Sequence, residues 1–158
     1  MCSGGPNTLL GVAVERPVMS ADCIFCQIVD GEIPSYTVHE DDDVLAFLDA
    51  NPLARGHTLV IPKAHHERLQ DLPADLAADY FGTLHDLVGR VEAAVDAPAS
   101  NVGFNNGEVS GQEVPHVHAH VVPRFEGDGG HPIHAVAGDR PDLSEDELES
   151  VAAAIRDA

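Results

Sequence analysis

The chain has 158 residues, of which 44% are hydrophobic, and this suits one domain with a substantial core. Its 27 acidic and 8 basic residues give a formal net charge of −19, so a nucleic-acid-binding role is disfavoured because such a surface repels phosphates. The apolar stretch at residues 8–14 is too short for a membrane span and lacks the flanks of a signal peptide, so we expect a cytoplasmic protein with no membrane partner.

The acidic residues are spread along the chain and do not form one tail. Ordinary solubility is one explanation for such a surface. We favour adaptation to high salt, because the Debye length falls to about 3 Å at 1 M and most of the self-repulsion is then screened.

The amino-terminal part, residues 1–20, has no clear periodicity and contains Gly4-Gly5-Pro6. Because Met19 precedes the first recognisable element, these residues are expected to be a disordered extension or the result of a misassigned start. Order is expected to begin at Cys23, with a short helical turn that runs to Val29 and is closed by a glycine.

Three strands and the one long helix follow. Residues 36–39 and 44–49 are predicted as strands around an acidic turn, and residues 57–61 as an apolar strand that stops at Pro62. The helix opens at Asp71-Leu72-Pro73, and its apolar residues recur at steps of three and four: Leu76, Tyr80, Leu84, Leu87, Val88, Val91 and Val95.

Two further strands are predicted, at residues 101–105 and 114–123, with a glycine-containing loop at residues 106–111 between them. After Phe125 the chain becomes rich in glycine and aspartate, and a Ser-x-x-Glu capping box starts an acidic helix at residues 144–155.

Strands outnumber helices and most connections are short, so the prediction is an α+β fold with an antiparallel sheet of about five strands, one long helix and one or two short ones. The domain limits we expect are residues 21–126 for the main domain and residues 127–158 for a Gly/Asp-rich segment with the acidic helix.

Three histidines, His116, His118 and His120, alternate with apolar residues in the last predicted strand. Side chains alternate between the faces of a strand, so the three imidazoles are expected on one face. They could bind one zinc ion that activates a water. Alternatively, one could act as a nucleophile while its neighbours orient it and assist the leaving group. The spacing alone does not choose between these chemistries.

The flanks of the histidines carry a resemblance. The segment Gly111-Gln112-Glu113-Val114-Pro115-His116-Val117-His118-Ala119-His120-Val121-Val122-Pro123-Arg124 resembles the signature of the histidine triad (HIT) family of nucleotide hydrolases and transferases. The segment His57–Lys63 is similar to the family's other recurrent segment. Asp22–Cys26 and Gly31–Ser35 resemble its prokaryotic amino terminus. The resemblance implies a HIT-like fold.

For catalysis, the resemblance implies that His118 attacks the α-phosphorus of a purine nucleoside phosphoramidate or a dinucleoside polyphosphate. The covalent nucleotidyl-histidine would then be hydrolysed by water. His120 would assist the leaving group, and His57 would support the triad from a neighbouring strand.

For nucleotide binding, it implies that Asn105 helps to hold the phosphate, with Gly107 and Gly111 allowing close approach of backbone N–H groups, and that Gln112 is a further nucleotide-binding residue. Asp49 would bind the ribose hydroxyls. Apolar walls around the purine would come from Phe25, Ile28, Ile33, Phe47 and Leu48. Glu113 departs from the family pattern, in which many members carry Ser or Thr. A carboxylate there repels phosphate unless it points away or serves a cationic leaving group, so it bears on the choice of substrate.

Cys23 and Cys26 have the two-residue spacing of a metal knuckle or a redox pair. Tetrahedral zinc needs two more ligands, and the resemblance supplies His65 and His116 for a structural Zn²⁺ site. It also implies a homodimer. Two other functions stay open: a nucleotide-binding regulatory protein with little turnover, and a zinc-dependent hydrolase that uses the three histidines as ligands.

Overall fold

The computed structural model describes residues 21–158, so the extension expected at residues 1–20 lies outside the described part of the chain. The described residues divide into two compact units, residues 21–126 and 127–158. None of the helices among the described residues is long and apolar enough to cross a lipid bilayer.

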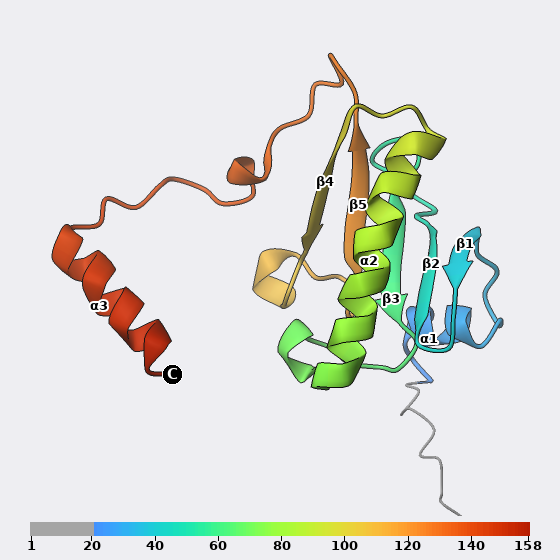
Figure 1. Cartoon of the computed structure of the whole chain (residues 1–158), viewed down its shortest axis with the longest axis horizontal. Helices are drawn as coiled ribbons and strands as arrows, with labels where there is room; N and C mark the ends of the chain where they lie inside the picture. The colour runs from blue at the N-terminus through green and yellow to red at the C-terminus, as the bar shows by residue number, and fades with distance from the viewer. Residues whose placement is uncertain (1–20) are drawn as a thin grey trace, which may run out of the picture. The chain divides into compact units, whose positions relative to one another are not determined.

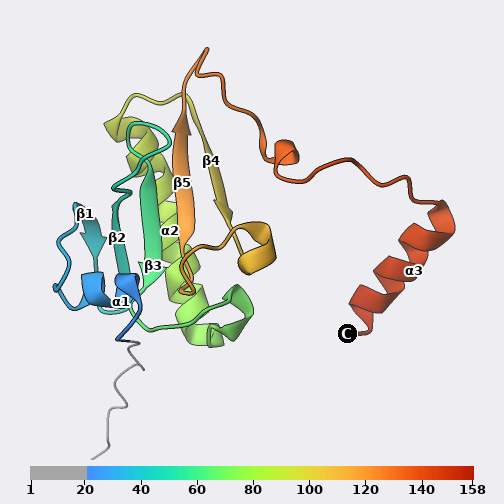
Figure 2. The ribbon, with the colours of Figure 1, turned by 180° about the vertical axis from the view of Figure 1, so that it is seen from behind.

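The first unit is built on one antiparallel sheet (Figures 1 and 2). Its strands are β1 (Thr37–Glu40), β2 (Val44–Leu48), β3 (Thr58–Pro62), β4 (Ala99–Phe104) and β5 (Ala119–Arg124). They lie in the order β1-β2-β3-β5-β4, and every neighbouring pair is antiparallel. The prediction of an α+β fold with a sheet of about five antiparallel strands is therefore confirmed.

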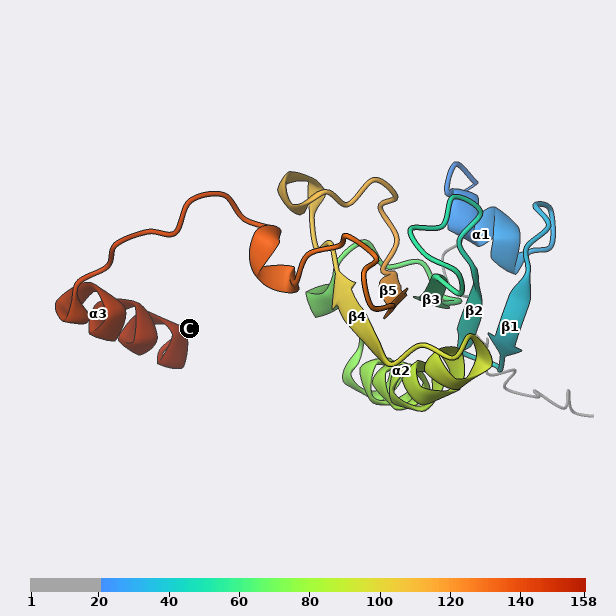
Figure 3. The same ribbon diagram turned by 90° about the horizontal axis from the view of Figure 1, so that it is seen from above.

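Two helices cover opposite faces of this sheet (Figure 3). The long helix α2 (Ala74–Ala94) lies along one face, and the short helix α1 (Ile24–Val29) lies on the other. Helix α2 ends where Asp96 adopts a left-handed conformation with φ of 54° and the Ala97 N–H donates to the Glu92 carbonyl over 2.9 Å.

Because side chains alternate along a strand, the sheet has an apolar cluster on each face. On the α2 side, residues of the sheet and the segment just before β5 pack against α2 and the turn just before it: Val44, Ala46, Val60, Val117, Ala119 and Val121 with Leu72, Tyr80, Leu84, Leu87 and Val91. On the α1 side the buried members are Cys23, Phe25, Cys26, Leu45, Phe47, Leu59 and Ile61.

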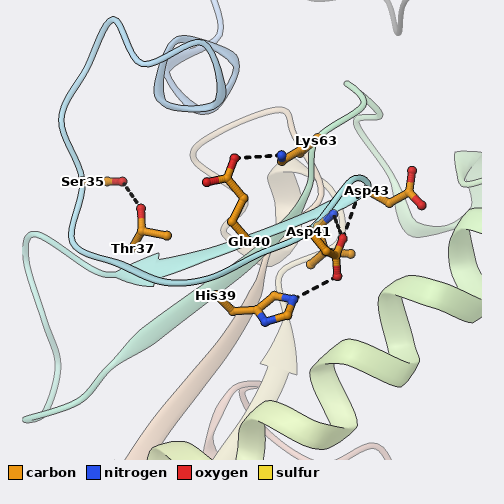
Figure 4. Close-up of polar contacts among 8 residues, drawn as sticks. Ser35, Thr37, His39, Glu40, Asp41, Asp43 and Lys63 are labelled. Atoms are coloured by element: carbon orange, nitrogen blue, oxygen red, sulfur yellow. Dashed lines mark hydrogen bonds and ion pairs between the residues drawn. The ribbon is translucent and has the colours of Figure 1, made fainter.

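The acidic turn between β1 and β2 is held by its own side chains (Figure 4). One carboxylate oxygen of Asp41 accepts the N–H groups of Asp43 and Val44 over 2.9 and 2.8 Å, and the other lies 2.9 Å from His39 Nε2. Lys63 Nζ, at the end of β3, donates to Glu40 over 2.8 Å. The turn therefore fixes the start of β2 in the sheet.

The prediction of a strand over residues 114–123 is wrong for its first part, since β5 begins only at Ala119. Pro115 has no N–H to donate to a neighbouring strand. The Val117 N–H donates to the His66 carbonyl over 2.7 Å, and the His116 N–H donates to the Val114 carbonyl over 2.8 Å. These bonds hold residues 114–118 outside the sheet ladder.

The second unit, residues 127–158, contains a single turn of 3₁₀ helix (Ile133–Ala135) and the helix α3 (Glu145–Arg156). The predicted capping box is present: Ser144 Oγ accepts the Glu147 N–H over 3.3 Å, and the Glu147 carboxylate accepts the Ser144 N–H over 2.8 Å. The amphipathic pattern of α3 leaves Leu148, Val151 and Ile155 exposed.

Candidate active site

A pocket lies where α1, the end of β2 and the connection from β4 to β5 meet. Ten of the residues predicted for catalysis or nucleotide binding line it: Phe25, Ile28, Ile33, Phe47, Leu48, Asp49, Asn105, Gly111, His118 and His120. The sheet therefore brings together side chains that are far apart in the sequence.

His118 has a defined ring orientation and tautomer. Its Nδ1 lies 2.7 Å from the His116 carbonyl oxygen, which can only accept, so Nδ1 carries the hydrogen. In the neutral ring, Nε2 then holds the lone pair. The Phe25 ring packs edge-on against the imidazole at 5.1 Å between centroids and fixes its position. The Nε2 lone pair of His118 is therefore not used by the hydrogen bond to the His116 carbonyl.

His120 is part of a chain of two imidazoles that starts from a backbone amide. The Leu53 N–H donates to His57 Nδ1 over 3.1 Å, so the hydrogen of His57 is on Nε2. His57 Nε2 lies 3.0 Å from His120 Nδ1 and donates to it, which leaves the hydrogen of His120 on Nε2. His120, which lines the pocket with His118, thus has an N–H donor to offer a phosphate or leaving-group oxygen or nitrogen.

Burial keeps both members of this chain neutral near pH 7. It lowers the pKa of His57, which is only 2% exposed, and the neighbouring Asp49 carboxylate offsets only part of this. Burial together with His118 and His57 lowers the pKa of His120 to about 4. The tautomers assigned to His57 and His120 are therefore those of the neutral rings.

Asp49 follows the end of β2 and borders the pocket beside His57. One of its oxygens accepts the Asn51 N–H over 2.9 Å, and the other lies 3.7 Å from His57 Nδ1. Asp49, His57 and His120 lie close enough to hold a metal ion, but both ring nitrogens of His57 already have hydrogen-bond partners. We therefore assign no metal there.

The connection from β4 to β5 is held by Gln112. Its carbonyl oxygen accepts the Gly107 N–H over 2.7 Å, and its amide donates to the carbonyls of Glu67 and Val114 over 2.8 and 3.0 Å. Both side-chain ends are thus used inside the protein, and neither Gln112 nor Gly107 borders the pocket. Gly107 has φ of 104°, and a Cβ there would lie 2.9 Å from the Arg68 guanidinium, so glycine is required.

Glu113 differs from its neighbour Gln112 in its surroundings. It is exposed, it borders the pocket, and it makes no hydrogen bond or ion pair with the other residues that the structure describes. A free carboxylate thus stands near the triad.

The four residues predicted to bind zinc form a compact group on the α1 side. The ligand atoms of Cys23, Cys26, His65 and His116 all lie within 4.8 Å of one another. His116 Nδ1 is 3.4 Å from Cys23 Sγ and 3.6 Å from Cys26 Sγ, and His65 Nδ1 is 3.4 Å from Cys26 Sγ. His116 Nε2 donates to the Pro62 carbonyl over 2.8 Å, which leaves the Nδ1 lone pair free. Two thiols and two imidazole nitrogens are a donor set that suits zinc.

Each triad imidazole therefore has a different set of partners. His116 faces the two cysteines, His118 is held by a carbonyl, and His120 is held by His57. This division of contacts argues against a site in which all three imidazoles bind one metal ion.

Comparison with known proteins decides the family. The model of the HIT domain matches residues 30–127. The chain belongs to the HIT domain family. This HIT protein is 50% identical to an uncharacterized HIT-like protein of Methanocaldococcus jannaschii over 68% of its own length and 82% of that protein.

Two further comparisons concern a named enzyme and a solved structure. The chain is 39% identical to a protein named adenosine 5'-monophosphoramidase of Saccharomyces cerevisiae, over 71% of its own length and 68% of that protein. A crystal structure of a HIT family member from Bacillus subtilis superposes with a TM-score of 0.77 and 35% identity, covering 86% of this chain and 96% of that one. The predicted HIT-like fold is confirmed.

The HIT pocket also has contributors that the sequence did not single out. The Leu53 N–H sets the tautomer of His57, yet no pattern marks a loop amide for such a role. Pro34, Ser35 and Tyr36 border the pocket, and the resemblance of Gly31–Ser35 to the family's amino terminus could have indicated the first two.

Proposed function

We propose that this HIT protein is a nucleotide hydrolase that works through a covalent nucleotidyl-histidine at His118. The observation that carries the proposal is the pair of tautomers in one pocket: His118 has a lone pair on Nε2, and His120 has a hydrogen on Nε2. A nucleophile and a hydrogen-bond donor on neighbouring side chains are what the displacement at phosphorus requires.

In the first step, the Nε2 lone pair of His118 attacks the α-phosphorus and the bond from phosphorus to the leaving group breaks. The N–H of His120 hydrogen-bonds the departing atom and passes its proton to it, and His120 recovers a proton from the water that attacks in the second step. Water then attacks the same phosphorus, the bond to His118 breaks, and the nucleotide is released. Over both steps one water is consumed: its hydroxyl ends on the phosphorus and its proton on the leaving group.

The substrate we propose is a purine nucleoside phosphoramidate or a dinucleoside polyphosphate. The base would lie against the apolar wall that contains Phe25, Ile33 and Phe47, and the ribose hydroxyls against Asp49. Asn105 and Gly111 would lie beside the phosphate. Gln112 contributes by holding the Gly107–Gly111 loop. The yeast relative's name, adenosine 5'-monophosphoramidase, supports the phosphoramidate.

The test is a panel of adenosine and guanosine phosphoramidates and diadenosine polyphosphates, assayed with the wild type and with His118→Ala. Wild type should turn over at least one of them and, on rapid quenching, show the added mass of a nucleotidyl group. The variant should lose that adduct and roughly 10³-fold or more in kcat/KM. His85→Ala, which changes an exposed histidine, is the matched control. Absence of turnover by wild type would instead favour the regulatory protein.

We also propose that Cys23, Cys26, His65 and His116 bind a structural zinc ion. Such an ion would join α1 to the end of β3 and to the segment before His118, and so hold the pocket together.

Elemental analysis of the native protein should find about one zinc per chain, and Cys26→Ser should lose the metal and unfold at a lower urea concentration. His66→Gln changes the imidazole next to His65, which is outside the ligand group, and should keep the bound zinc and the wild-type stability in urea. A metal-free protein with unchanged stability would contradict this site.

We also propose that the protein is a homodimer, and sedimentation of the full chain at high KCl checks this.

A further inference from the structure

The charged side chains around the pocket have the same sign as a phosphate. Among the described residues that border it, the only charged side chains are the carboxylates of Asp49 and Glu113, and there is no lysine or arginine. The phosphate can obtain hydrogen bonds from His120 and from the loop, but no cation compensates its charge.

The two carboxylates differ in their hydrogen-bond and ion-pair partners. Asp49 accepts the Asn51 N–H and lies beside His57. Glu113 has no hydrogen-bond or ion-pair partner within residues 21–158, and its side chain is exposed at the pocket border. Its negative charge is therefore available to whatever occupies that part of the pocket.

The location of Glu113 points to the leaving group. The apolar wall for the base comes from α1 and β2, whereas Glu113 lies on the connection from β4 to β5, two residues after Gly111. With the nucleoside on the apolar wall and the phosphorus at His118, the group that departs is left with the polar part of the border.

Electrostatics then separates the substrate classes. A polyphosphate leaving group adds negative charges beside a carboxylate that has no counter-ion, and this is repulsive. An amine whose chain carries an ammonium group is attracted at the same place. The chain's net charge of −19 acts in the same direction over longer distances, but salt screens that contribution more strongly.

We propose that Glu113 is a specificity-determining residue, which selects nucleoside phosphoramidates whose leaving amine bears a second, positively charged amino group. The proposal rests on the proposed hydrolase function and narrows its substrate to cationic phosphoramidates over dinucleoside polyphosphates.

The test uses three adenosine 5'-phosphoramidates whose N-alkyl chains have equal length and end in a methyl, an ammonium or a carboxylate group. For wild type, kcat/KM should be roughly tenfold higher with the ammonium than with the methyl compound, and lowest with the carboxylate. In Glu113→Gln this ammonium-to-methyl ratio should fall to about one. In Glu108→Gln, which removes an exposed carboxylate of the same loop that does not border the pocket, the ratio should stay at the wild-type value.

A binding measurement keeps this inference separate from the proposed function. AMP esters of an aminoalkyl and an alkyl alcohol of equal length, which lack the labile P–N bond, are titrated into the His118→Ala protein with and without Glu113→Gln. Tighter binding of the amino ester, lost with Glu113→Gln, supports the selection even if wild type hydrolyses nothing. If the amino ester binds more tightly than the alkyl ester by the same factor in both proteins, the proposed role of Glu113 is wrong, whether or not the wild type turns over any substrate.

Discussion

At the scale of single residues, two backbone groups set the tautomers of His57 and His118. The Leu53 N–H can only donate and the His116 carbonyl can only accept, so the hydrogens of His57 and His118 are placed without any charged partner. His57 Nε2–H then donates to His120 Nδ1, which places the hydrogen of His120 on its Nε2. This matters because a neutral imidazole has one donor and one acceptor, and exchanging them in His120 would present a lone pair to the substrate.

This arrangement predicts that His57 contributes to the reaction by donating its Nε2–H to His120. In His57→Leu, His120 loses the partner that places its hydrogen, and kcat/KM should fall at least roughly tenfold, which is part of the 10²–10⁴ that a positioned proton donor supplies. His57→Gln retains an N–H near the position of Nε2 and should stay within about threefold of wild type. The measurement is the rate of nucleotidyl-enzyme formation, together with its pH profile. Equal rates for the Leu variant and wild type would show that His120 does not need His57.

At the scale of elements, Tyr80 joins the long helix to the strands beside the site. Its ring is fully buried on α2, and its hydroxyl donates to the Val60 carbonyl over 2.7 Å and accepts the Ala119 N–H over 3.1 Å. Val60 and Ala119 are the last pair in the register of β3 and β5. Burial raises the pKa of this phenol, so it stays protonated and able to donate. Helix, β3 and β5 are therefore connected next to His118 and His120.

Replacing Tyr80 by Phe should leave the Val60 carbonyl and the Ala119 N–H without partners in the core. Such unpaired buried groups cost about 1–3 kcal/mol, so the free energy of unfolding should fall by that amount in urea titrations. Tyr36→Phe, which changes an exposed tyrosine, should be nearly neutral for stability. A Tyr80→Phe protein as stable as wild type would mean that water or a small shift satisfies both groups.

The sequence predicted the elements well because they depend on local periodicity, and it predicted the sites less completely because they depend on contacts between distant segments. The apolar stripe on α2 predicted which face of the helix is buried. It did not predict that the hydroxyl of Tyr80, within that stripe, donates a hydrogen bond to the Val60 carbonyl. The strand predicted over residues 114–123 was wrong for residues 114–118, because the Val117 N–H binds the His66 carbonyl, a partner that only the fold brings near. Gln112 was predicted only as a nucleotide-binding residue, and no sequence pattern indicated that its side chain holds the loop through Gly107 and Glu67.

At the scale of the whole molecule, the dominant feature is the net charge of −19. In the first unit part of it is concentrated where the β1–β2 turn faces α2, in a shallow depression bordered by Asp41, Asp42, Asp43, Asp79 and Asp86. The bonds of Asp41 to His39 and to the turn stabilise that carboxylate (Figure 4), and His85 Nδ1 lies 3.1 Å from Asp86. The remaining carboxylates repel one another across the turn and the helix.

This repulsion predicts a protein that is more stable in concentrated KCl. Raising the salt from about 0.1 M to 1 M shortens the Debye length from about 10 to 3 Å, so the free energy of unfolding should rise over that interval. The double variant Asp42→Asn/Asp79→Asn removes two carboxylates of the depression. It should gain roughly 0.2–1 kcal/mol at low salt and show a weaker salt dependence. Glu32→Gln, an exposed carboxylate outside the depression, should keep the wild-type salt dependence. Equal stability of the wild type at low and multimolar KCl would contradict the adaptation to salt. If the free energy of unfolding depends equally on KCl concentration in all three proteins, the depression does not contribute to the salt dependence.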